Sequence, residues 1–308
     1  MTGKIDSINI SVAKGTEKTE IPSCIVTMKG IEGDAHAGLW HRQISVLDKS
    51  SIDNFSNEKD IELSPGAFGE NLVIDGIDLK KVSVLDRFIT GEVELEVTQI
   101  GKKCHGDACS IFRRTGECIM PKVGLFTRVI KEGSINKGQS VELVERKLKF
   151  HIITLSDRAF SGEYPDESGP MFEKMVQEHF SNLRWHLQIE KSIIPDEPEL
   201  LKTMLIKDRE DQVDFVITTG GTGIGPRDIT PEVVLSLADM TIPGIMDHIR
   251  LVYGKDHPSA LISRSVATVM GKTIVFTLPG SVKAVREYTQ ELQKNFEHLI
   301  LMLHGIGH

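Results

Sequence analysis

The sequence has few of the residues that mark secreted, membrane-bound or nucleic-acid-binding proteins. It contains 308 residues, of which only four are cysteine and two are tryptophan. Cysteine this sparse argues against a disulfide framework, and no apolar run approaches the length that spans a bilayer. Acidic residues outnumber basic ones by 44 to 36, which gives a formal net charge of -8 and argues against general nucleic-acid binding. We therefore expect no membrane segment and no nucleic-acid partner.

The N-terminus also lacks the apolar core of a signal peptide, so we expect a cytoplasmic protein. Charged residues make up 26% of the chain and hydrophobic residues 40%, proportions that are typical of globular proteins. A chain of this length is expected to form two domains. The first would span residues 1–146 and the second residues 150–308, with a locally basic hinge at residues 145–149.

The first half shows the pattern of short strands separated by turns. Residues 92–98 alternate polar and apolar side chains, and Ile8, Ile10 and Val12 alternate in the same way near the start. Alternation with a period of two predicts strands. Because glycine and proline recur at short intervals, the strands predict a closed or sandwiched all-β domain. One helix is expected near residues 48–55.

The pattern changes at residue 150. Apolar runs at residues 150–155, 187–194, 214–217 and 273–277 alternate with segments of helical periodicity, the last of which is one long helix after residue 281. Strands that alternate with helices are typical of a three-layer α/β domain with a mainly parallel sheet.

A glycine-rich loop follows the apolar run at residues 214–217. Its glycines can take positive φ angles and turn backbone N–H groups toward an anion, above all a phosphate. Arg227 and Asp228 come next, and Thr230 is placed to cap a helix that has Pro231 at its first position. The loop is neither a GxGxxG fingerprint nor a P-loop, and no lysine follows it. It could also be only a tight turn.

Four strand ends of the second half carry glycine, serine or aspartate. They are Ser156-Asp157-Arg158, residues 196–197, residues 218–228, and Pro279-Gly280-Ser281. In open α/β sheets ligands bind beyond the carboxyl ends of the strands, so these segments should converge on one crevice. Asp157, Asp196 and Ser281 could instead cap helices. Arg158 and Arg227 could be surface charges.

Carboxylates beside several anion-binding backbones suit phosphoryl or nucleotidyl transfer. Mg²⁺ takes one or two carboxylates together with the phosphates of a substrate, and glycine loops can hold phosphate oxygens. No serine–base or cysteine–base pair is evident in the sequence, so covalent catalysis is not indicated.

Several motifs of the second half occur in an order that is typical of one family. They are residues 155–158, 166–170, 194–196, 218–223, 226–231 and 278–281. With them the second half resembles the Mog/MoaB family of molybdopterin-binding domains. The resemblance implies a molybdopterin adenylyltransferase, which joins the phosphate of molybdopterin to the α-phosphate of ATP and releases pyrophosphate. Asp196 and Asp228 match the family's catalytic acids, and we expect them to position Mg²⁺ and the triphosphate.

The resemblance also implies the binding residues. Those expected to hold phosphate, pterin or nucleotide are Ser156, Asp157, Thr219, Gly220, Gly221, Thr222, Gly223, Pro279, Gly280 and Ser281. The substrates would be molybdopterin and ATP, used with Mg²⁺. Family members commonly form trimers, so a homo-oligomer is expected, and a molybdenum insertase could be a partner. The alternative is a protein that binds or carries the cofactor without turnover.

Three of the four cysteines cluster in the first half, with a histidine beside the first: Cys104, His105, Cys109 and Cys118. Their spacing is not that of a paired zinc-ribbon site. Basic residues at 102–103 and 113–114 flank the cluster, and nearby cations favour a reactive thiolate. The cluster could instead consist of ordinary thiols in a barrel loop or bind a metal. Cys24 lies within a strand pattern and is expected in the core.

Further motifs of the first half are residues 33–38, 41–43, 65–71 and 101–105, followed by Cys109. With them this half resembles the MOSC domain, a β-barrel that is thought to bind the molybdenum cofactor or to carry sulfur on a cysteine. Cys104 is the first candidate for that cysteine and Cys109 the second, and a cysteine desulfurase could be a partner. Some motif residues could instead only hold turns, namely His36, His41, Arg42, Glu70 and Asn71. Both halves point to molybdenum-cofactor biosynthesis, by analogy of fold.

Overall fold

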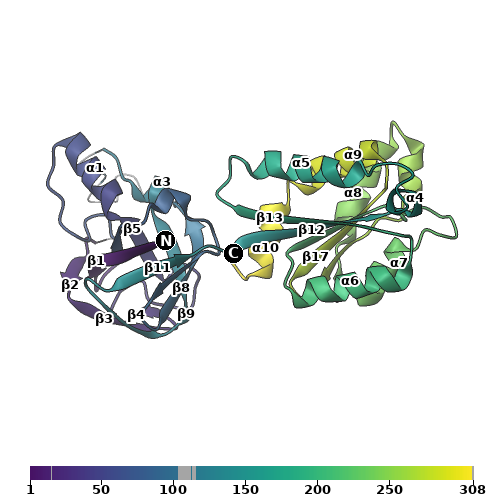
Figure 1. Cartoon of the computed structure of the whole chain (residues 1–308). Coiled ribbons are helices and arrows are strands. Elements are labelled where there is room, and N and C mark those ends of the chain that lie inside the picture. The colour runs from purple at the N-terminus through teal and green to yellow at the C-terminus, as the bar shows by residue number, and fades with distance from the viewer. Residues whose placement is uncertain (15, 103–111, 113–115, 307–308) are drawn as a thin grey trace. The chain divides into compact units, whose positions relative to one another are not determined.

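A computed structural model gives the fold of the chain (Figure 1). The structure describes residues 1–14, 16–102, 112 and 116–306. The predicted thiols Cys104 and Cys109 therefore lie outside the described residues. The chain divides into two compact units, Met1–Arg146 and Lys147–His308, and each unit has a hydrophobic core of its own. Within the described ranges no helix is both long enough and apolar enough to cross a membrane.

The first unit contains a closed barrel. Its strands, within the described residues, are β1 (Thr2–Ile10), β5 (Ile44–Asp48), β6 (Leu72–Asp75), β7 (Arg87–Thr90), β8 (Val93–Ile100), β9 (Leu125–Lys131) and β11 (Ser140–Val144). They follow the order β11-β7-β8-β9-β5-β6-β1, and β11 pairs with β1 to close the ring. Closure leaves these strands without a free sheet edge between them. The predicted all-β barrel is confirmed.

Shorter elements surround the barrel. They are β2 (Thr19–Ile21), β3 (Ser23–Thr27), β4 (Gly30–Ile31), β10 (Gly133–Asn136), α1 (Lys49–Lys59), η1 (Leu79–Lys81) and α3 (Met120–Val123). Strand β2 extends the barrel from β1, and β10, β3 and β4 form a separate small sheet. Helix α1 is the helix expected near residues 48–55. It begins after Asp48, whose side chain accepts a hydrogen bond from the Ser51 N–H at 2.7 Å.

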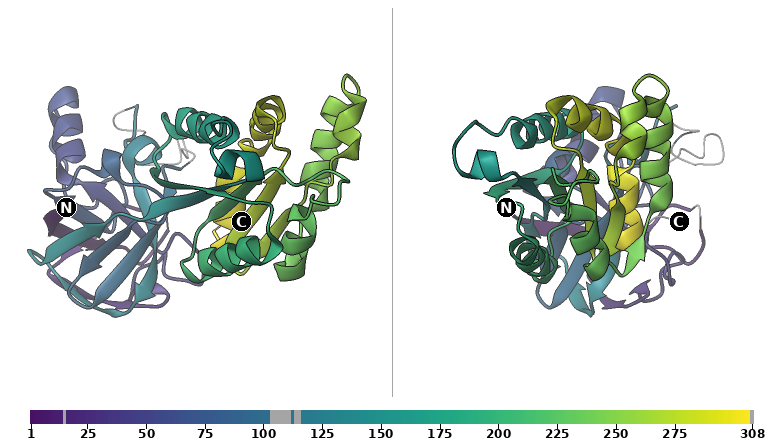
Figure 2. Two further views of the ribbon diagram at one scale, coloured as in Figure 1. Left: turned by 45° about the vertical axis from the view of Figure 1, so that its right-hand side comes forward. Right: turned by 90° about the vertical axis from the view of Figure 1, so that its right-hand side faces the viewer.

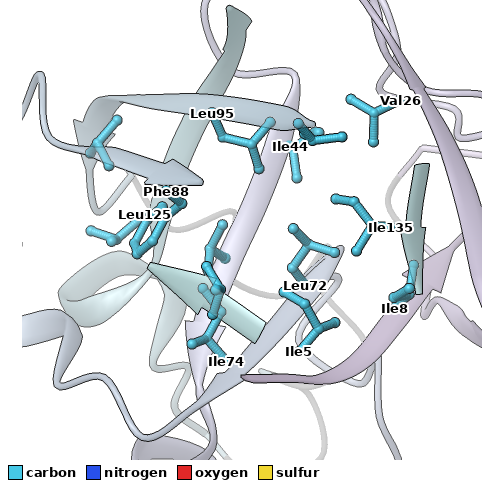
Figure 3. Packing of buried hydrophobic residues seen from close by; sticks show 14 of the residues in the cluster. Ile5, Ile8, Val26, Ile44, Leu72, Ile74, Phe88, Leu95, Leu125 and Ile135 are labelled. Atoms are coloured by element: carbon cyan, nitrogen blue, oxygen red, sulfur yellow. The ribbon is translucent and has the colours of Figure 1, made fainter. Parts of the chain in front are cut away.

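The interior of the barrel is filled mainly by apolar side chains at alternate strand positions, although in β1 a register shift separates the core residues Ile5 and Ile8 by three positions. Ile5, Leu72, Ile74, Phe88 and Leu95 point into this core (Figure 3). Burial of this much apolar surface is the main favourable contribution to folding. The alternation that the sequence shows is therefore the alternation between core and solvent.

Two sequence-based assignments in this unit have clear outcomes. Cys24 is buried in the core, as expected, and burial raises the pKa of its thiol to about 11. The extension of the first strand to Val12 is wrong, because β1 ends at Ile10 and Val12 is 93% exposed. The chain leaves the sheet there, since the Ser11 carbonyl accepts a hydrogen bond from the Ala35 N–H at 2.7 Å.

The second unit contains a six-stranded sheet. Its strands are β12 (Lys147–Leu155), β13 (His186–Ile194), β14 (Phe215–Thr219), β15 (Met240–Thr241), β16 (Ala267–Met270) and β17 (Thr273–Leu278). The order is β13-β12-β14-β17-β16-β15. The first four strands of that order pair in parallel, and β16 and β15 are antiparallel. The predicted mainly parallel sheet is confirmed.

Helices cover both faces of this sheet. Helices α5 (Ser168–Phe180) and α9 (Val282–Leu292) lie on one face, and α6 (Pro198–Glu210) and α7 (Thr230–Leu237) lie on the other (Figure 1 and Figure 2). The remaining helices are α4 (Asp157–Phe160), α8 (Pro243–Gly254), η3 (Pro258–Ile262) and α10 (Phe296–Leu303). The predicted three-layer arrangement is confirmed.

The final helix is interrupted, contrary to the single long helix that the sequence predicts. Helix α9 ends at Leu292 and α10 begins at Phe296. The break lets the Phe296 ring enter a cluster with Phe150 and Phe215, whose ring centroids lie 5.7 and 4.9 Å from it. Aromatic pairs at such distances stabilise a core, and this contact is not encoded in the local periodicity.

Candidate functional site

A pocket of about 940 Å³ opens in the second unit, beyond the carboxyl ends of β12, β14 and β17. Nine of the residues expected there from the sequence line it: Ser156, Asp157, Asp196, Thr219, Gly220, Gly221, Asp228, Gly280 and Ser281. The structure thus brings together all four strand ends. Thr222, Gly223 and Pro279 are not among the lining residues. Ligands of open α/β sheets bind at this edge.

The glycine loop turns sharply at two residues, Gly220 and Gly221, where the surrounding atoms leave no room for a side chain. Gly220 and Gly221 have φ angles of +101° and +63°. A Cβ on Gly220 would lie 2.3 Å from the Leu155 carbonyl oxygen, and one on Gly221 would lie 2.4 Å from Thr230 Oγ1. Only glycine adopts this conformation in this space without strain. The close approach of β14 to the end of β12 therefore depends on these two glycines.

Thr230 holds the far side of the loop. Its hydroxyl donates to the Gly220 carbonyl at 3.0 Å and its N–H donates to the Gly221 carbonyl at 3.1 Å. The expectation that Thr230 caps α7 is wrong, because the N-cap position is Ile229 and Thr230 is the first helical residue. Pro231 is therefore the second helical residue and not, as the sequence predicted, the first, although it still lies in the first turn. The hydroxyl is used by the loop instead of the helix.

The carboxylates of the pocket connect three chain segments. Asp157 Oδ1 accepts a hydrogen bond from the Asp196 N–H at 3.2 Å, and the other oxygen pairs with the Arg227 guanidinium. Asp228 Oδ2 accepts a hydrogen bond from the Gly225 N–H at 2.7 Å. Asp196 makes no side-chain cap on α6, whereas Ser281 does cap α9 by accepting from the Ala284 N–H at 3.2 Å. Asp157 lies in the first turn of α4, but the N-cap of that helix is Ser156, and all three acids line the pocket.

Asp196 is the carboxylate whose ionisation the pocket perturbs. Partial burial raises the pKa of Asp196, and the negative charges of Asp157 and Asp228 raise it further. A hydrogen bond from the Asp157 backbone and the positive charge of Arg227 lower the pKa of Asp196. Perturbed carboxyl groups gathered in a pocket are typical of functional sites.

A polar network lines part of the pocket, and its side chains apart from Thr219 had no predicted role. Asp166 accepts hydrogen bonds from the Thr154 hydroxyl at 2.8 Å and from the Ser168 N–H and hydroxyl at 2.9 and 2.8 Å. Ser168 Oγ lies 2.9 Å from Thr219 Oγ1, next to the glycine loop. The motif at residues 166–170 contained this signal. Its spacing, Asp followed two residues later by Ser at a helix start, is that of a capping turn.

One further residue of the pocket, Tyr164, was missed, and it contacts Arg158 of the first predicted strand end. Tyr164 Oη lies 3.0 Å from Ser156 Oγ, and the Arg158 guanidinium stacks on the Tyr164 ring at 5.0 Å. Both side chains line the pocket. Tyr164 lies in a polar stretch without periodicity, so no local pattern indicates that it turns back toward Ser156.

The donor set suits Mg²⁺ that arrives with a phosphorylated substrate. Among the described residues no group of three or more His, Cys, Asp or Glu side chains is arranged to hold a metal ion. Asp196 and Asp228 line the same pocket. Mg²⁺ is commonly held by one or two carboxylates plus phosphate oxygens and water, so two acids beside a glycine loop fit this mode.

A serine–histidine–aspartate chain lies elsewhere in the second unit, although the sequence showed no serine–base pair. His151 Nδ1 lies 2.8 Å from both Asp208 oxygens, and His151 Nε2 lies 2.9 Å from Ser192 Oγ. His151 and Asp208 are buried and link β12 to α6. A cavity of about 280 Å³ is lined by His151 and Asp208 but not by Ser192. These three hydrogen-bonded residues therefore join α6 to strands β12 and β13.

In the first unit, two acidic residues of the predicted motifs, Asp34 and Glu70, accept hydrogen bonds from backbone N–H groups. Asp34 forms a buried ion pair with Lys18 at 2.8 Å and accepts from the Ser11 N–H at 3.0 Å. Burial alone would raise the pKa of Asp34, but hydrogen bonds from His36 and Lys18, together with the Lys18 charge, keep that pKa well below its usual range. Glu70 accepts hydrogen bonds from the N–H groups of Gly66 and Phe68 at 2.8 and 3.0 Å.

Three basic motif residues of this unit have buried nitrogen atoms without a hydrogen-bond partner in the described structure: His36 Nδ1, His41 Nδ1 and Arg42 Nε. His36 Nδ1 lies 3.5 Å from Asp34 Oδ2, whereas among the described residues the other two face no such acid. Burial and the charges of Arg42 and Arg128 lower the pKa of His41. The Arg42 guanidinium stacks on Trp40 at 5.0 Å. Buried polar groups are normally paired, so the nitrogen atoms of His41 and Arg42 could receive a ligand.

Comparison with known proteins finds a family model that matches part of each unit. Residues 151–298 match the model of a family described as a probable molybdopterin binding domain. Residues 33–142 match the model of the MOSC domain. Both resemblances seen in the motifs are thereby confirmed, each in the half where the motifs lie.

The second unit is similar to several characterised proteins. Molybdopterin adenylyltransferase of Helicobacter pylori is 37% identical over 138 residues, which cover 44% of this chain and 76% of that protein. Molybdenum cofactor synthesis protein cinnamon of Drosophila melanogaster is 34% identical over 51% of this chain, and the match spans only 26% of that protein. Among solved structures, the molybdopterin biosynthesis Mog protein from Mycobacterium ulcerans shares 33% identity, with 52% of this chain and 99% of that chain covered and a TM-score of 0.48.

Proposed function

The second half of this chain belongs to the molybdopterin-binding family that includes the molybdopterin adenylyltransferases, and we propose that it uses ATP and Mg²⁺ to adenylylate molybdopterin. The coarser conclusion, a role in molybdenum-cofactor biosynthesis, follows from this membership. The transfer reaction itself is supported by one observation above all. Asp196, Asp228 and the glycine loop line a single pocket at the carboxyl edge of a parallel sheet.

The reaction joins two phosphates. A terminal phosphate oxygen of molybdopterin attacks the α-phosphorus of ATP, the bond to the β-phosphate oxygen breaks, and pyrophosphate leaves with that electron pair. No covalent enzyme intermediate is required. Catalysis of such a step consists largely of alignment and charge stabilisation.

Residues of the chain would supply both contributions. The N–H group of Gly221 and the N-terminus of α9 behind Ser281 would offer donors to phosphate oxygens, whereas the Gly220 N–H donates to the Leu278 carbonyl at 2.9 Å. Asp196 and Asp228 would hold Mg²⁺, which when bound supplies positive charge to the triphosphate. Ser156 and Asp157 would face the pterin or the nucleotide from the end of β12.

The test is release of pyrophosphate from ATP in the presence of molybdopterin and Mg²⁺, with mass-spectrometric detection of adenylyl-molybdopterin. Asp196→Asn and Asp228→Asn are expected to lose most of this activity while keeping the fold, because each retains the shape but not the charge. Asp256→Asn is the matched control, since Asp256 is exposed and does not line the pocket. Wild-type rates in both pocket variants would refute the assigned roles.

A carrier without turnover is the alternative, and the same assay separates the two functions. Binding of molybdopterin with no pyrophosphate and no adenylylated product would favour the carrier. We further propose that the second unit acts as a trimer, as the resemblance implies. Measurement of the assembly mass in solution tests this proposal.

For the first unit we propose that the barrel binds the molybdenum cofactor or carries sulfur on Cys104 or Cys109. The observation in its favour is the pair of unpartnered buried nitrogens on His41 and Arg42. Mass spectrometry after incubation with a cysteine desulfurase and cysteine would detect a persulfide on either thiol. If alkylation of both thiols leaves cofactor formation intact, sulfur transfer by this unit is excluded.

A further inference from the structure

Arg264 lies between η3 and β16, outside every motif that the sequence analysis singled out. Its backbone N–H donates to the Thr222 carbonyl at 3.0 Å. Its side chain reaches the same loop, with Nε donating to the Gly223 carbonyl at 2.6 Å and Nη2 donating to the Asp228 carbonyl at 2.7 Å. One residue therefore contacts the glycine loop at three points.

The two carbonyls held by the guanidinium stand at the two ends of a short exposed segment. Residues 224–227 between them are exposed, and Ile224 is 77% exposed. The segment has little packing of its own to fix it. Within it, the Gly225 N–H donates to Asp228 Oδ2 at 2.7 Å, so the direction of the Asp228 carboxylate depends on the conformation of the whole segment.

The backbone on either side of Arg264 is fixed by a second arginine, Arg250. Arg250 of α8 donates from Nε to the Ser263 carbonyl at 3.0 Å and from Nη2 to the Ser265 carbonyl at 2.7 Å. These carbonyls flank Arg264 on both sides, and Ser265 is fully buried. A rigid base of this kind is what a supporting residue needs in order to fix a functional group.

We propose that Arg264 is the positioning residue of the site: by bridging the carbonyls of Gly223 and Asp228, it fixes the loop so that the Asp228 carboxylate faces the pocket. Arg264 does not line the pocket, so it acts through Asp228 rather than on the substrate. The role depends on the planar, forked guanidinium, which presents two N–H donors in fixed directions. A lysine ammonium cannot reproduce that geometry.

The inference rests on the proposed adenylyl transfer, and its first test is Arg264→Lys. Displacement of a catalytic group by about 1 Å can cost on the order of 10²-fold in rate, so kcat for pyrophosphate release should fall by about that factor. The KM for molybdopterin should change much less, because its pocket residues are untouched. The matched control is Arg209→Lys, since Arg209 forms an exposed ion pair with Asp239 away from the pocket.

The ion pair of Arg264 with Glu232 provides a second comparison. Glu232→Gln removes the negative partner but leaves both carbonyl bridges in place. Exposed ion pairs contribute little, so kcat should stay within about threefold of wild type. If kcat falls as much in Glu232→Gln as in Arg264→Lys, the bridge between the two carbonyls is not the cause of the loss and the proposal fails.

A double-mutant cycle tests whether Arg264 acts through Asp228. In an Asp228→Asn background, Arg264→Lys should lower the residual rate by less than about twofold, because the group that it positions is already inactive. If the two losses instead multiply, Arg264 acts independently of Asp228 and the proposal fails.

A readout that needs no turnover separates this proposal from the proposed function. Hydrogen exchange of the amides in residues 223–229 should be at least about tenfold faster in Arg264→Lys than in wild type, with the amides of β14 unchanged. If wild type releases no pyrophosphate, the adenylyltransferase assignment fails, while faster exchange still supports the bridge. Unchanged exchange overturns the bridge, whatever the activity.

Discussion

Arg227 of the glycine loop forms an ion pair with Asp157 at the end of β12. The same aspartate accepts a hydrogen bond from the Asp196 N–H at 3.2 Å. The two contacts tie together the ends of β12, β13 and β14, and they place one cation and one anion beside the carboxyl group of Asp196. The ionisation of Asp196 is therefore set by residues on two other segments.

Substitution of these neighbours should shift the pH dependence of activity in opposite directions. Arg227→Gln removes a cation that lowers the pKa of Asp196, so that pKa rises and the acid limb of pyrophosphate release moves to higher pH. Asp157→Asn removes an anion that raises the pKa of Asp196, so the acid limb moves to lower pH. The measurement is the pH profile of kcat/KM in both variants and wild type.

Arg158→Gln is the control for this pair. Arg158 lines the same pocket but stacks on Tyr164, and it is not among the charges that act on Asp196. Its acid limb should coincide with that of wild type. Shifts of the same sign in Arg227→Gln and Asp157→Asn would mean that a group other than Asp196 controls the limb.

Gly220→Ala should destabilise the second unit and abolish activity. The new Cβ would lie 2.3 Å from the Leu155 carbonyl oxygen, in a residue whose φ is +101°. Overpacking of this kind costs about 1–3 kcal/mol. Gly244→Ala is the matched control, because no atom lies within 4 Å of that Cβ position. Denaturant unfolding followed through Trp185, in a Trp40→Phe background, measures both; equal stability of the two variants would contradict the argument.

Glu70 should make the stability of the first unit depend on pH. Burial raises the pKa of Glu70 to about 7, although hydrogen bonds from backbone N–H groups oppose the rise. The folded unit therefore holds a proton that the unfolded chain releases above its ordinary glutamate pKa. Stability from this proton is complete below about pH 4.5 and is lost as the pH rises through about 7, by about 3 kcal/mol in total.

The difference in unfolding free energy between wild type and Glu70→Gln isolates this effect. His41 and the other titrating groups are the same in both proteins, so their contributions cancel. Relative to the variant, wild type should lose stability between pH 5 and pH 8, as measured through Trp40 in a Trp185→Phe background. A difference that stays constant over this range would show that Glu70 titrates normally.

The chain of His151, Asp208 and Ser192 should matter for stability and not for adenylyl transfer. Asp208→Ala leaves a buried imidazole without its partner and should cost about 2 kcal/mol. Ser192→Ala removes one hydrogen bond at a half-buried position and should cost about 1 kcal/mol or less. Unfolding measured through Trp185 tests both values, and kcat for pyrophosphate release should stay unchanged.

The architecture was predictable because periodicity reports burial directly. Val93, Leu95 and Val97 alternate in sequence and all three are buried in β8. Three of the four apolar runs of the second half likewise become inner strands, β12, β14 and β17, and the run at residues 187–194 becomes the edge strand β13. In both cases the pattern of one segment is sufficient, because the segment contributes a whole face to the core.

The convergence of the site was also predictable, because the carboxyl ends of parallel strands share one edge. Contacts between a loop and a residue far along the chain were not predictable. Arg264 lies 36 residues beyond Asp228, and nothing in its neighbourhood distinguishes it from a surface arginine. Thr230 was assigned to the helix because a hydroxyl at that position usually caps one, whereas the loop competes for the same hydroxyl.

Strand β1 closes the barrel, since Thr2 to Lys4 pair with Ser140 to Glu142, which lie near the C-terminal end of the first unit in the sequence. During synthesis the ring must stay open until the ribosome has released residues near 144. The chain begins β12 three residues later, at Lys147. Because residues near 144 leave the ribosome only after further chain has been added behind them, β12 is already being synthesised when the barrel closes.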